Sequence, residues 1–320
     1  MVSIALCTYD GERYIAEQLE SLINQTRQPD EIIICDDQSK DNTVIVAKRV
    51  LNSWQGKWKI IVNDKNLGYK KNFQKAISLC SGEFIFLSDQ DDVWDKRKLE
   101  IILDAFHNHP DAIMVFHDAE LVNENLQSIY PSLWATMGFD YRQFRNNVYG
   151  RFMKGNVVQG AACAFKRKLF DIAQPFPAEA IHDEWLALNA IPNGGIYPVN
   201  EKLLKYRQTG HNEIGAVSEN ILGKVRKWSK NIQVRLKLHH EGLIRYAAVW
   251  DVLSEKYGHQ LVLGNEDANT FSEFLNCRRD AISMKVIDKL PSLQNYFSIY
   301  TSQKMALWTK VKDIFTVVFN

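Results

Sequence analysis

The chain has 320 residues, which is enough for one large domain or two smaller ones. Its 39 lysine and arginine residues nearly balance its 38 aspartate and glutamate residues, which excludes the global positive field of a nucleic-acid-binding protein. The five cysteines form no CxxC pair and predict reduced, buried thiols instead of a disulfide framework or a zinc site. The N-terminus lacks a basic leader and no run of about 18 apolar residues occurs, so we expect no signal peptide, no membrane-spanning helix and a cytoplasmic location.

Short apolar runs alternate with amphipathic segments over the first 110 residues. The expected strands and the helices that follow them are 2–8 and 15–23, 31–35 and 44–51, 59–62 and 69–79, and 84–87 and 96–106. This alternation is typical of a parallel sheet with helices on both faces, which is an α/β fold. Further strands are expected at 113–116 and 161–165. After a boundary near residue 215, long helical patterns predict an α-helical C-terminal extension.

Three polar loops follow strands of the predicted sheet. They are TYDGE after the first strand, DDQSKD after the second and SDQDD after the fourth. Ligands of open α/β sheets bind beside the carboxyl ends of the strands. We therefore expect all three loops to open onto one crevice.

The most acidic of these loops contains Asp89, Asp91 and Asp92 within four positions. Two like charges at about 4 Å repel by roughly 4 kcal/mol at an effective dielectric near 20. A divalent cation such as Mg²⁺ would remove this repulsion, because it binds one or two carboxylates together with substrate phosphates, and it would stabilise a leaving diphosphate. An EF-hand pattern, a GxGxxG motif and a P-loop are all absent from the sequence.

Two other interpretations of the acidic loop stay open at this point. Asp89 and Asp92 could simply cap the next helix. Alternatively, the chain could be a phosphatase or phosphotransferase in which Asp89 attacks, Asp91 acts as the acid and Lys96 or Lys71 holds the phosphate.

Six motifs in order resemble the inverting family 2 glycosyltransferases of the GT-A fold. The motifs are ALCTYDGERYIAEQLESLINQT, IICDDQSKDNT, NLGYKKNF, SGEFIFLSDQDDVW, IHDEW and LLKYRQTGHNEIGA. They resemble in particular bacterial rhamnosyltransferases that build surface polysaccharide, over about residues 1–216. The resemblance implies a Rossmann-like nucleotide-binding sheet flanked by helices in a catalytic domain over 1–215. Within it, residues 1–110 would bind the nucleotide sugar and residues 111–215 the acceptor, while 216–320 form the helical extension.

The resemblance also implies a donor pocket. Thr8 and Tyr9 match residues that line the pocket for the nucleotide base. Asp37, with Asp36 beside it, matches the aspartate that accepts a hydrogen bond from the pyrimidine N3–H. Uracil and thymine carry this N–H and cytosine does not, so a dTDP- or UDP-sugar donor is favoured. The choice of dTDP-L-rhamnose comes from the resemblance alone.

The phosphate and metal contacts follow from the same resemblance. Asp89 and Asp91 match the DxD motif, in which Asp91 would bind Mg²⁺ or Mn²⁺ and Asp89 would lie near the ribose or the outer shell of the metal. Lys71 and Asn72 match polar contacts to the donor, although Lys71 could equally be a surface residue. Arg207 is a candidate phosphate contact because its guanidinium fits two oxygens, although a surface role is open.

One position departs from the family pattern. Relatives often have a histidine directly after YRQ, whereas here Thr209 follows and the histidine is His211. A metal or phosphate contact from His211 is therefore in doubt, and a solvated loop position is the alternative.

An inverting transfer needs one group that removes the proton of the acceptor hydroxyl, on the side of the sugar opposite the diphosphate. Asp183 in IHDEW matches the catalytic aspartate of the family, and Trp185 matches an aromatic that often follows it. Asp183 could also be the N-cap of a helix over 184–191. Glu184 is the alternative base if the register shifts by one. KGNVVQGAACAF matches a segment that borders the acceptor site, or is simply a tightly packed strand.

The predicted extension combines a basic run with a terminal apolar stripe over 307–318. The basic residues of the run are Lys224, Arg226, Lys227, Lys230, Arg235 and Lys237. Basic amphipathic helices bind anionic membranes, and a lipid-linked oligosaccharide acceptor would favour binding to the inner face of the cell membrane. Packing on the catalytic domain with a solvated basic face and homodimer formation are the alternatives.

The whole pattern predicts an inverting, metal-dependent glycosyltransferase that extends a bacterial surface glycan. The rivals are the phosphotransferase or phosphatase described above and a non-catalytic carbohydrate-binding protein on the same scaffold.

Overall fold

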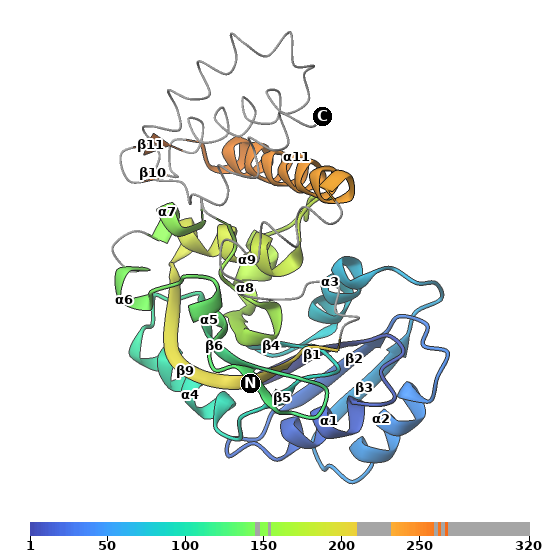
Figure 1. Cartoon of the computed structure of the whole chain (residues 1–320). Coiled ribbons are helices and arrows are strands. Elements are labelled where there is room, and N and C mark those ends of the chain that lie inside the picture. Colours follow the sequence, from blue (N-terminus) through green and yellow to red (C-terminus); the bar gives the residue numbers. More distant parts are fainter. Residues whose placement is uncertain (145–147, 153–154, 210–231, 259–261, 264–265, 268–320) are drawn as a thin grey trace. The chain divides into compact units, whose positions relative to one another are not determined.

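The computed structural model describes residues 1–144, 148–152, 155–209, 232–258, 262–263 and 266–267 (Figure 1). The chain divides into two compact units, and the first consists of Met1–Asn146, Val157–Phe176 and Ile181–Val217. The second consists of Asn147–Asn156, Pro177–Ala180 and Ser218–Asn320. The predicted boundary near 215 and His211 lie outside the described residues, as do the side chains of the basic run and of the terminal stripe.

A nine-stranded sheet forms the centre of the first unit, within the described part of the chain. Its order is β3-β2-β1-β4-β8-β6-β9-β5, with β7 paired to β6. The strands are β1 (Val2–Thr8), β2 (Glu31–Asp36), β3 (Lys57–Val62), β4 (Phe84–Ser88), β5 (Val93–Trp94), β6 (Met114–Val122), β7 (Ser128–Tyr130), β8 (Cys163–Lys166) and β9 (Ile196–Arg207).

The strand directions bring several carboxyl ends to one edge of the sheet. β1 to β4 run parallel. β8 is antiparallel to both β4 and β6, so β6 runs in the direction of β4, and β9 is parallel to β6. The end of β9 therefore lies at the same edge as the acidic loop that follows β4.

Helices cover both faces of the parallel strands. The longer ones are α1 (Ile15–Ile23), α2 (Thr43–Leu51), α3 (Tyr69–Leu79), α4 (Lys98–Asn108), α8 (Arg167–Ile172) and α9 (His182–Ala190). Shorter turns are α5 (Leu133–Thr136), α6 (Tyr141–Phe144), η1 (Gly160–Ala162) and η2 (Ile191–Asn193). Figure 1 shows α1 and α2 on one face of β1 to β3 and α3 on the other. The predicted α/β sheet with helices on both faces is thereby confirmed.

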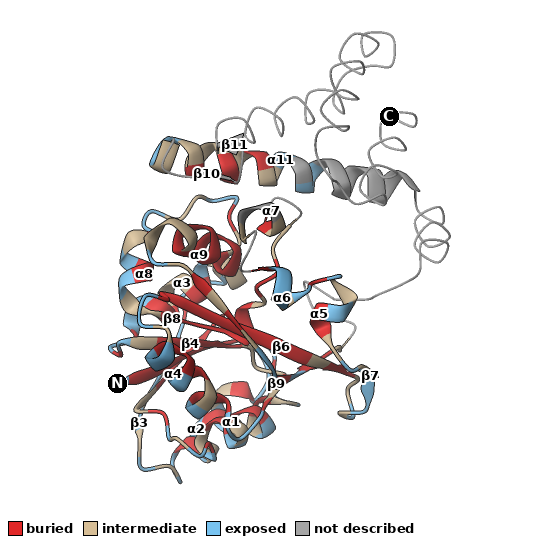
Figure 2. Cartoon of the chain, turned by 90° about the vertical axis from the view of Figure 1, so that its left-hand side faces the viewer, coloured by how far each residue is buried: buried red, intermediate tan, exposed pale blue. Residues whose placement is uncertain are grey.

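The core follows from this layering. Every residue of β1 is buried, as expected for a strand covered on both faces. Figure 2 shows β6 mostly in the red of buried residues. α1 buries Ile15, Leu19 and Leu22, which fall on one face at helical spacing. The four described cysteines are buried and free, as predicted, and Cys277 lies outside the described residues.

Within the first unit, the described strands β5, β7 and β9 were not predicted from the sequence. β9 contains Pro198 and exposed residues at 200–202, so its apolar alternation is interrupted. Its pairing with β6 shifts register on both sides of Asp118, and such shifts leave no clear signal in sequence. β5 has only two residues, and because of it the predicted helix over 96–106 begins later, at Lys98.

The described part of the second unit is mainly helical. It contains α7 (Val148–Phe152), α11 (Ile232–Tyr257) and a short pair of strands, β10 (Val262–Leu263) and β11 (Glu266–Asp267). The Tyr246 hydroxyl donates a hydrogen bond to the Phe152 carbonyl, and Trp250 is fully buried. Among the described helices, none has the length and apolar character that crossing a membrane would require.

Candidate active site

The three polar loops contact one another at the carboxyl edge of the sheet, as predicted. The Thr8 hydroxyl at the end of β1 donates to Asp36 Oδ2 at the end of β2, at 2.7 Å. The loop after β4 joins them through Gln90, whose Oε1 accepts the Tyr9 N–H at 2.8 Å and whose Nε2 donates to the Tyr9 carbonyl at 2.9 Å. Gln90 was not selected from the sequence, although it is the middle residue of DQD.

The four residues predicted for the base pocket have different exposures. Thr8 and Asp36 are buried and bond to each other, and Asp36 also accepts the Ser39 amide and hydroxyl. Tyr9 leaves 50% of its surface exposed. Tyr9 is therefore available to a base, whereas Thr8 and Asp36 hold the loops together behind it.

Asp37 is 3% exposed and binds the chain after β3. Its Oδ1 accepts the Asn63 side-chain amide and the Leu67 N–H, each at 2.7 Å, and its Oδ2 accepts the Gly68 N–H at 2.8 Å. A carboxylate has about four lone-pair sites, so these three donors leave one for a base N–H.

α3 carries the two predicted polar donor contacts, and the structure gives Asn72 a role in the fold. Asn72 is 1% exposed, accepts a hydrogen bond from Asn63 at 2.9 Å and donates to the Cys35 carbonyl at 2.8 Å. Its amide therefore joins α3 to β2, and a contact of Asn72 with a donor stays a prediction. Lys71 is exposed on α3, and its contact with a donor stays a prediction.

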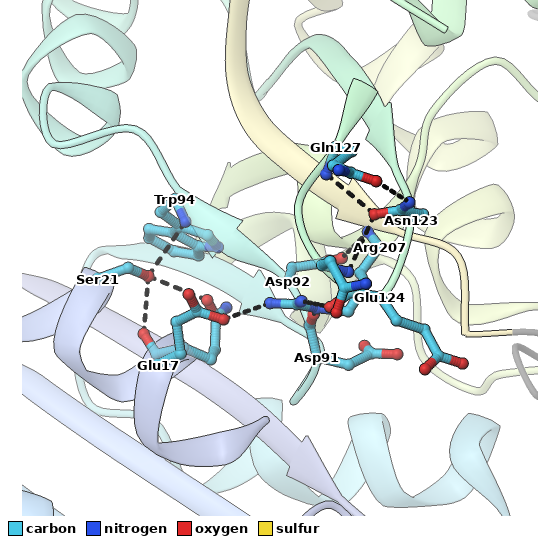
Figure 3. Close-up of polar contacts among 11 residues, drawn as sticks. Glu17, Ser21, Asp91, Asp92, Trp94, Asn123, Glu124, Gln127 and Arg207 are labelled. Carbon is cyan, nitrogen blue, oxygen red and sulfur yellow. Dashed lines mark hydrogen bonds and ion pairs between the residues drawn. The ribbon is translucent and has the colours of Figure 1, made fainter. Parts of the chain in front are cut away.

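Arg207 makes several contacts within the protein, and its predicted phosphate contact stays a prediction. Its guanidinium donates from Nε to the Asp91 carbonyl at 2.6 Å, from Nη1 to the Glu124 carbonyl and from Nη2 to Glu17 Oε2 (Figure 3). Its backbone N–H donates to Asp92 Oδ1 at 3.0 Å, and its side chain is 2% exposed. All three guanidinium nitrogens are thus used inside the protein. Arg207 therefore fixes the acidic loop to the end of β9.

Burial governs the electrostatics of the acidic loop. It raises the pKa of Asp91, and it raises the pKa of Asp92 well above its ordinary value, with the charges of Asp91 and Asp89 adding to the effect on Asp92. Asp92 Oδ2 is a buried oxygen without a hydrogen-bond partner. The capping alternative does not explain these residues, because α4 begins only at Lys98 and no side chain caps it.

These carboxylates fit a hard divalent cation. No cluster of three or more histidine, cysteine, aspartate or glutamate side chains in the described ranges could hold a metal by itself. Mg²⁺ sites, however, commonly use one or two carboxylates and take their remaining oxygens from substrate phosphates and water. The carboxylates of Asp89 and Asp91 are donors of this kind.

Asp183 lies in the first turn of α9 and is 6% exposed. Its Oδ1 accepts the Glu184 N–H at 2.6 Å, while the N-cap position is Ile181. Trp185 is fully buried and its indole N–H donates to the Ala173 carbonyl at 2.7 Å, which fixes the start of the helix. Asp183 is therefore held rigidly by its own helix.

Tyr206 is a buried residue of β9 that lies between the acidic loop and the segment beside Asp183. Burial raises its pKa, and the negative charges of Asp92, Asp89, Asp91 and Asp183 raise it further. The Tyr206 hydroxyl accepts a hydrogen bond from Gln159 Nε2 at 3.3 Å, and Gly160, next to Gln159, lies against Asp183. The backbone N–H of the following residue, Arg207, donates to Asp92 in the acidic loop. The end of β9 therefore links the acidic loop to the segment beside Asp183.

His182, next to Asp183, was not selected from the sequence. Its ring stacks on Phe73 of α3, with centroids 4.2 Å apart and planes at 21°. Both ring nitrogens are buried without a hydrogen-bond partner. Burial, and secondarily the charge of Lys70, lowers the pKa of His182 to about 3, so the ring is neutral at physiological pH.

This depressed pKa predicts a loss of stability as the pH falls. The unfolded chain protonates His182 near pH 6.5 and the folded chain does not, so the free energy of unfolding decreases as the pH falls from 6.5 towards 3. From pH 7.5 to 5.5 the contribution is about 1.4 kcal/mol. We expect His182→Phe, which keeps the stacking, to lose this part of the pH dependence in urea unfolding. His107→Gln on α4 is the control and should unfold as the wild type does at each pH. If the free energy of unfolding of His182→Phe depended on pH as that of the wild type does, the assignment to His182 would be wrong.

Comparisons with known proteins agree with this geometry. The family model "Glycosyl transferase family 2" matches residues 3–171. A dTDP-rhamnosyl transferase of Shigella flexneri, RfbG, is 27% identical over 253 residues, covering 75% of this chain and 79% of that protein. WfgD of Escherichia coli, a UDP-Glc:alpha-D-GlcNAc-diphosphoundecaprenol beta-1,3-glucosyltransferase, is 26% identical over 202 residues, covering 62% of this chain and 73% of WfgD. An uncharacterised protein of Mycobacterium tuberculosis is 26% identical over 216 residues, or 66% of this chain, which spans only 59% of that relative.

Solved structures show the same fold. S. aureus TarS in complex with UDP-GlcNAc superposes with a TM-score of 0.56 at 17% identity, covering 98% of this chain and 79% of that chain. The mannosyltransferase PcManGT of Pyrobaculum calidifontis, in complex with GDP-Man and Mn²⁺, gives a TM-score of 0.55 at 15% identity, covering 99% of this chain and 86% of that chain. These likenesses confirm the GT-A-type fold. The family model matches more than half of the chain, and the chain therefore belongs to glycosyl transferase family 2.

Proposed function

We propose that this chain transfers a sugar, with inversion, from a dTDP- or UDP-sugar to a hydroxyl group of a growing bacterial surface glycan. The catalytic domain would span 1–215 and the helical extension 216–320. One observation carries the proposal: the end of β9 links the acidic loop to the segment beside Asp183, because the Arg207 N–H donates to Asp92 while the Tyr206 hydroxyl accepts from Gln159, whose neighbour Gly160 lies against Asp183. A transferase needs a group that binds the diphosphate on one side of the sugar and a base that activates the acceptor on the other. In this proposal the acidic loop is the first of these and Asp183 is the second.

In this mechanism Asp183 is the base. The acceptor oxygen attacks the anomeric carbon from the face opposite the diphosphate, the bond from that carbon to the diphosphate breaks, and the acceptor proton passes to the Asp183 carboxylate. We assign the proton to Oδ2, because Oδ1 accepts the Glu184 amide. Fixing the carboxylate in this way reduces the entropy lost on reaching the transition state.

The donor side is assigned to the loops after β1, β2 and β4. The base would stack on the exposed Tyr9 and donate its N3–H to Asp37, which keeps one lone-pair site for it. A Mg²⁺ or Mn²⁺ ion held by Asp91, with Asp89 beside it, would supply positive charge to the departing diphosphate. Arg207 keeps the loop in place for this role through the Asp91 carbonyl.

The donor we propose is dTDP-L-rhamnose, supported by the likeness to RfbG. A UDP-sugar is the second candidate, supported by the likeness to WfgD, and both bases carry the required N–H. A lipid-linked acceptor is supported by the diphosphoundecaprenol substrate named for WfgD. Binding to the inner membrane face and dimerisation stay predictions, because the side chains expected to mediate them lie outside the described residues.

Asp91→Asn tests the donor site. The amide keeps the shape of the side chain but loses the charge that binds a cation, so we expect the Mn²⁺-dependent affinity for dTDP or UDP to fall by about 10- to 100-fold, the range seen when groups supporting metal sites are removed. Isothermal titration with Mn²⁺ and with chelator measures the change. Asp104→Asn, on the exposed face of α4, is the matched control and should leave the affinity unchanged. Equal affinities for Asp91→Asn and wild type would remove the metal assignment.

A further inference from the structure

Lys98 is a fully buried lysine directly behind the acidic loop. It is the first residue of α4 and has 0% of its surface exposed. Its Nζ donates to the Ala161 carbonyl at 2.6 Å and lies 3.6 Å from the centre of the Trp94 ring. Burying an amine is costly, so a lysine at this position must contribute interactions that an apolar side chain would not supply.

One end of these contacts reaches the acidic loop. Trp94 follows Asp92 by two residues and forms β5, which pairs with β9 through Leu204. Burial lowers the pKa of Lys98 to about 7, and the negative charge of Asp92 opposes this effect. The ammonium group of Lys98 contacts the segment that leaves the acidic loop through the face of the Trp94 ring.

The other end reaches the base. Ala161 belongs to η1, and its neighbour Gly160 lies against α9. A Cβ added at Gly160 would be 3.0 Å from His182 Nε2 and 3.6 Å from Asp183 Oδ2. The turn that accepts the Lys98 hydrogen bond thus packs directly on the Asp183 carboxylate.

We propose that Lys98 is a positioning residue that sets the spacing between the acidic loop and Asp183 by contacting Trp94 on one side and the Ala161 carbonyl on the other. This inference rests on the proposed function. The hydrogen bond to Ala161 is available to the amine and to the ammonium form alike, so the positioning does not depend on the protonation of Lys98.

The test separates turnover from donor binding. In Lys98→Met the volume is kept but the hydrogen bond and charge are lost, so the base shifts relative to the sugar while the nucleotide contacts of Tyr9 and Asp37 stay intact. Release of nucleoside diphosphate from dTDP-L-rhamnose, or from the UDP-sugar that reacts fastest, measures transfer to water. We expect kcat to fall by at least about 10-fold, because misplacement of reacting groups by 1 Å can cost roughly 100-fold. The Kd of dTDP or UDP with Mn²⁺ should change by less than about threefold.

Lys166→Met is the matched control. Lys166 makes similar contacts away from the acidic loop, because its Nζ donates to the Pro110 carbonyl at 2.5 Å and lies 5.7 Å from the Phe106 ring centre. It should keep wild-type kcat. The proposal would be overturned if Lys98→Met kept the wild-type kcat. It would also be overturned if the fall in kcat were matched by an equal rise in the Kd of dTDP or UDP with Mn²⁺.

A second variant keeps the test decisive if Lys98→Met does not fold. Gly160→Ala disturbs the same spacing from the other end, because its Cβ would lie only 3.0 Å from Nε2 of His182, the residue before Asp183. It should lower kcat with little change in Kd, and wild-type kcat would contradict the inference. A wild-type protein that releases no nucleoside diphosphate from any donor would instead contradict the proposed function.

Discussion

Replacing Asp183 with asparagine is expected to lower kcat by about 10²- to 10⁴-fold, the usual contribution of a positioned general base. Asparagine keeps the shape of the side chain and can still accept the Glu184 amide through its carbonyl oxygen, so α9 should begin as before. It cannot take the proton of the acceptor hydroxyl. The measurement is the release of nucleoside diphosphate from the donor, alongside the Kd of the donor nucleotide with Mn²⁺, which should stay within about threefold of wild type.

Glu184→Gln is the control for this variant, because Glu184 is the alternative base if the register shifts by one. Glu184 is 3% exposed in the same turn of α9, so the two substitutions disturb the fold to a similar degree. We expect Glu184→Gln to keep most of the turnover. If it lost turnover while Asp183→Asn kept it, Glu184 would be the base.

Replacing Arg207 with methionine is expected to lower the free energy of unfolding by about 3 kcal/mol, the lower end of the range for breaking a buried ion pair. The lower end applies because the Glu17 side chain, its charged partner, is 47% exposed and is screened by water. The Asp91 and Glu124 carbonyls would also lose their donors. Since these bonds hold the acidic loop to β9, the Mn²⁺-dependent binding of nucleoside diphosphate should weaken as well.

Arg13→Met provides a direct comparison in urea unfolding. Arg13 pairs with the Glu124 carboxylate at 2.7 Å, but its side chain is 63% exposed and that of Glu124 is 41% exposed. An exposed pair contributes less than about 1 kcal/mol. Equal, small losses in the Arg13 and Arg207 variants would contradict the role of Arg207 as the anchor of the loop.

The first half of the fold could be predicted because its signals are local. β1, β2 and β4 are mainly apolar runs and the helices between them have apolar residues at helical spacing, so the alternation of strands and helices along the chain and the meeting of the loops at one edge followed from general rules. Asp91, Asp183, Tyr9 and Asp37 were selected by their place in motifs, and their roles stay predictions.

The roles of Arg207 and Asn72 could not be predicted, because they depend on long-range pairing. Arg207 contacts the Asp91 carbonyl across 116 positions of sequence, and this contact requires the register of β9 on β6, with its shifts beside Asp118. The residue type alone does not indicate whether an arginine side chain is buried or exposed. The burial of Lys98 could not be predicted for the same reason. A lysine at the start of a helix is usually solvated, and its hydrogen bond to the Ala161 carbonyl depends on how η1 packs.

The most direct test of the central claim is thermal and chemical unfolding of the wild-type protein with dTDP, UDP and their sugar conjugates, with Mn²⁺ or Mg²⁺ and with chelator. A ligand that binds only the folded chain, at about 100 times its Kd, adds roughly 2.7 kcal/mol to the free energy of unfolding. We predict a stabilisation that requires the metal and is largest for one dTDP- or UDP-sugar. No stabilisation by any nucleotide, with or without metal, would contradict the assignment of the acidic loop and Asp183 to sugar transfer.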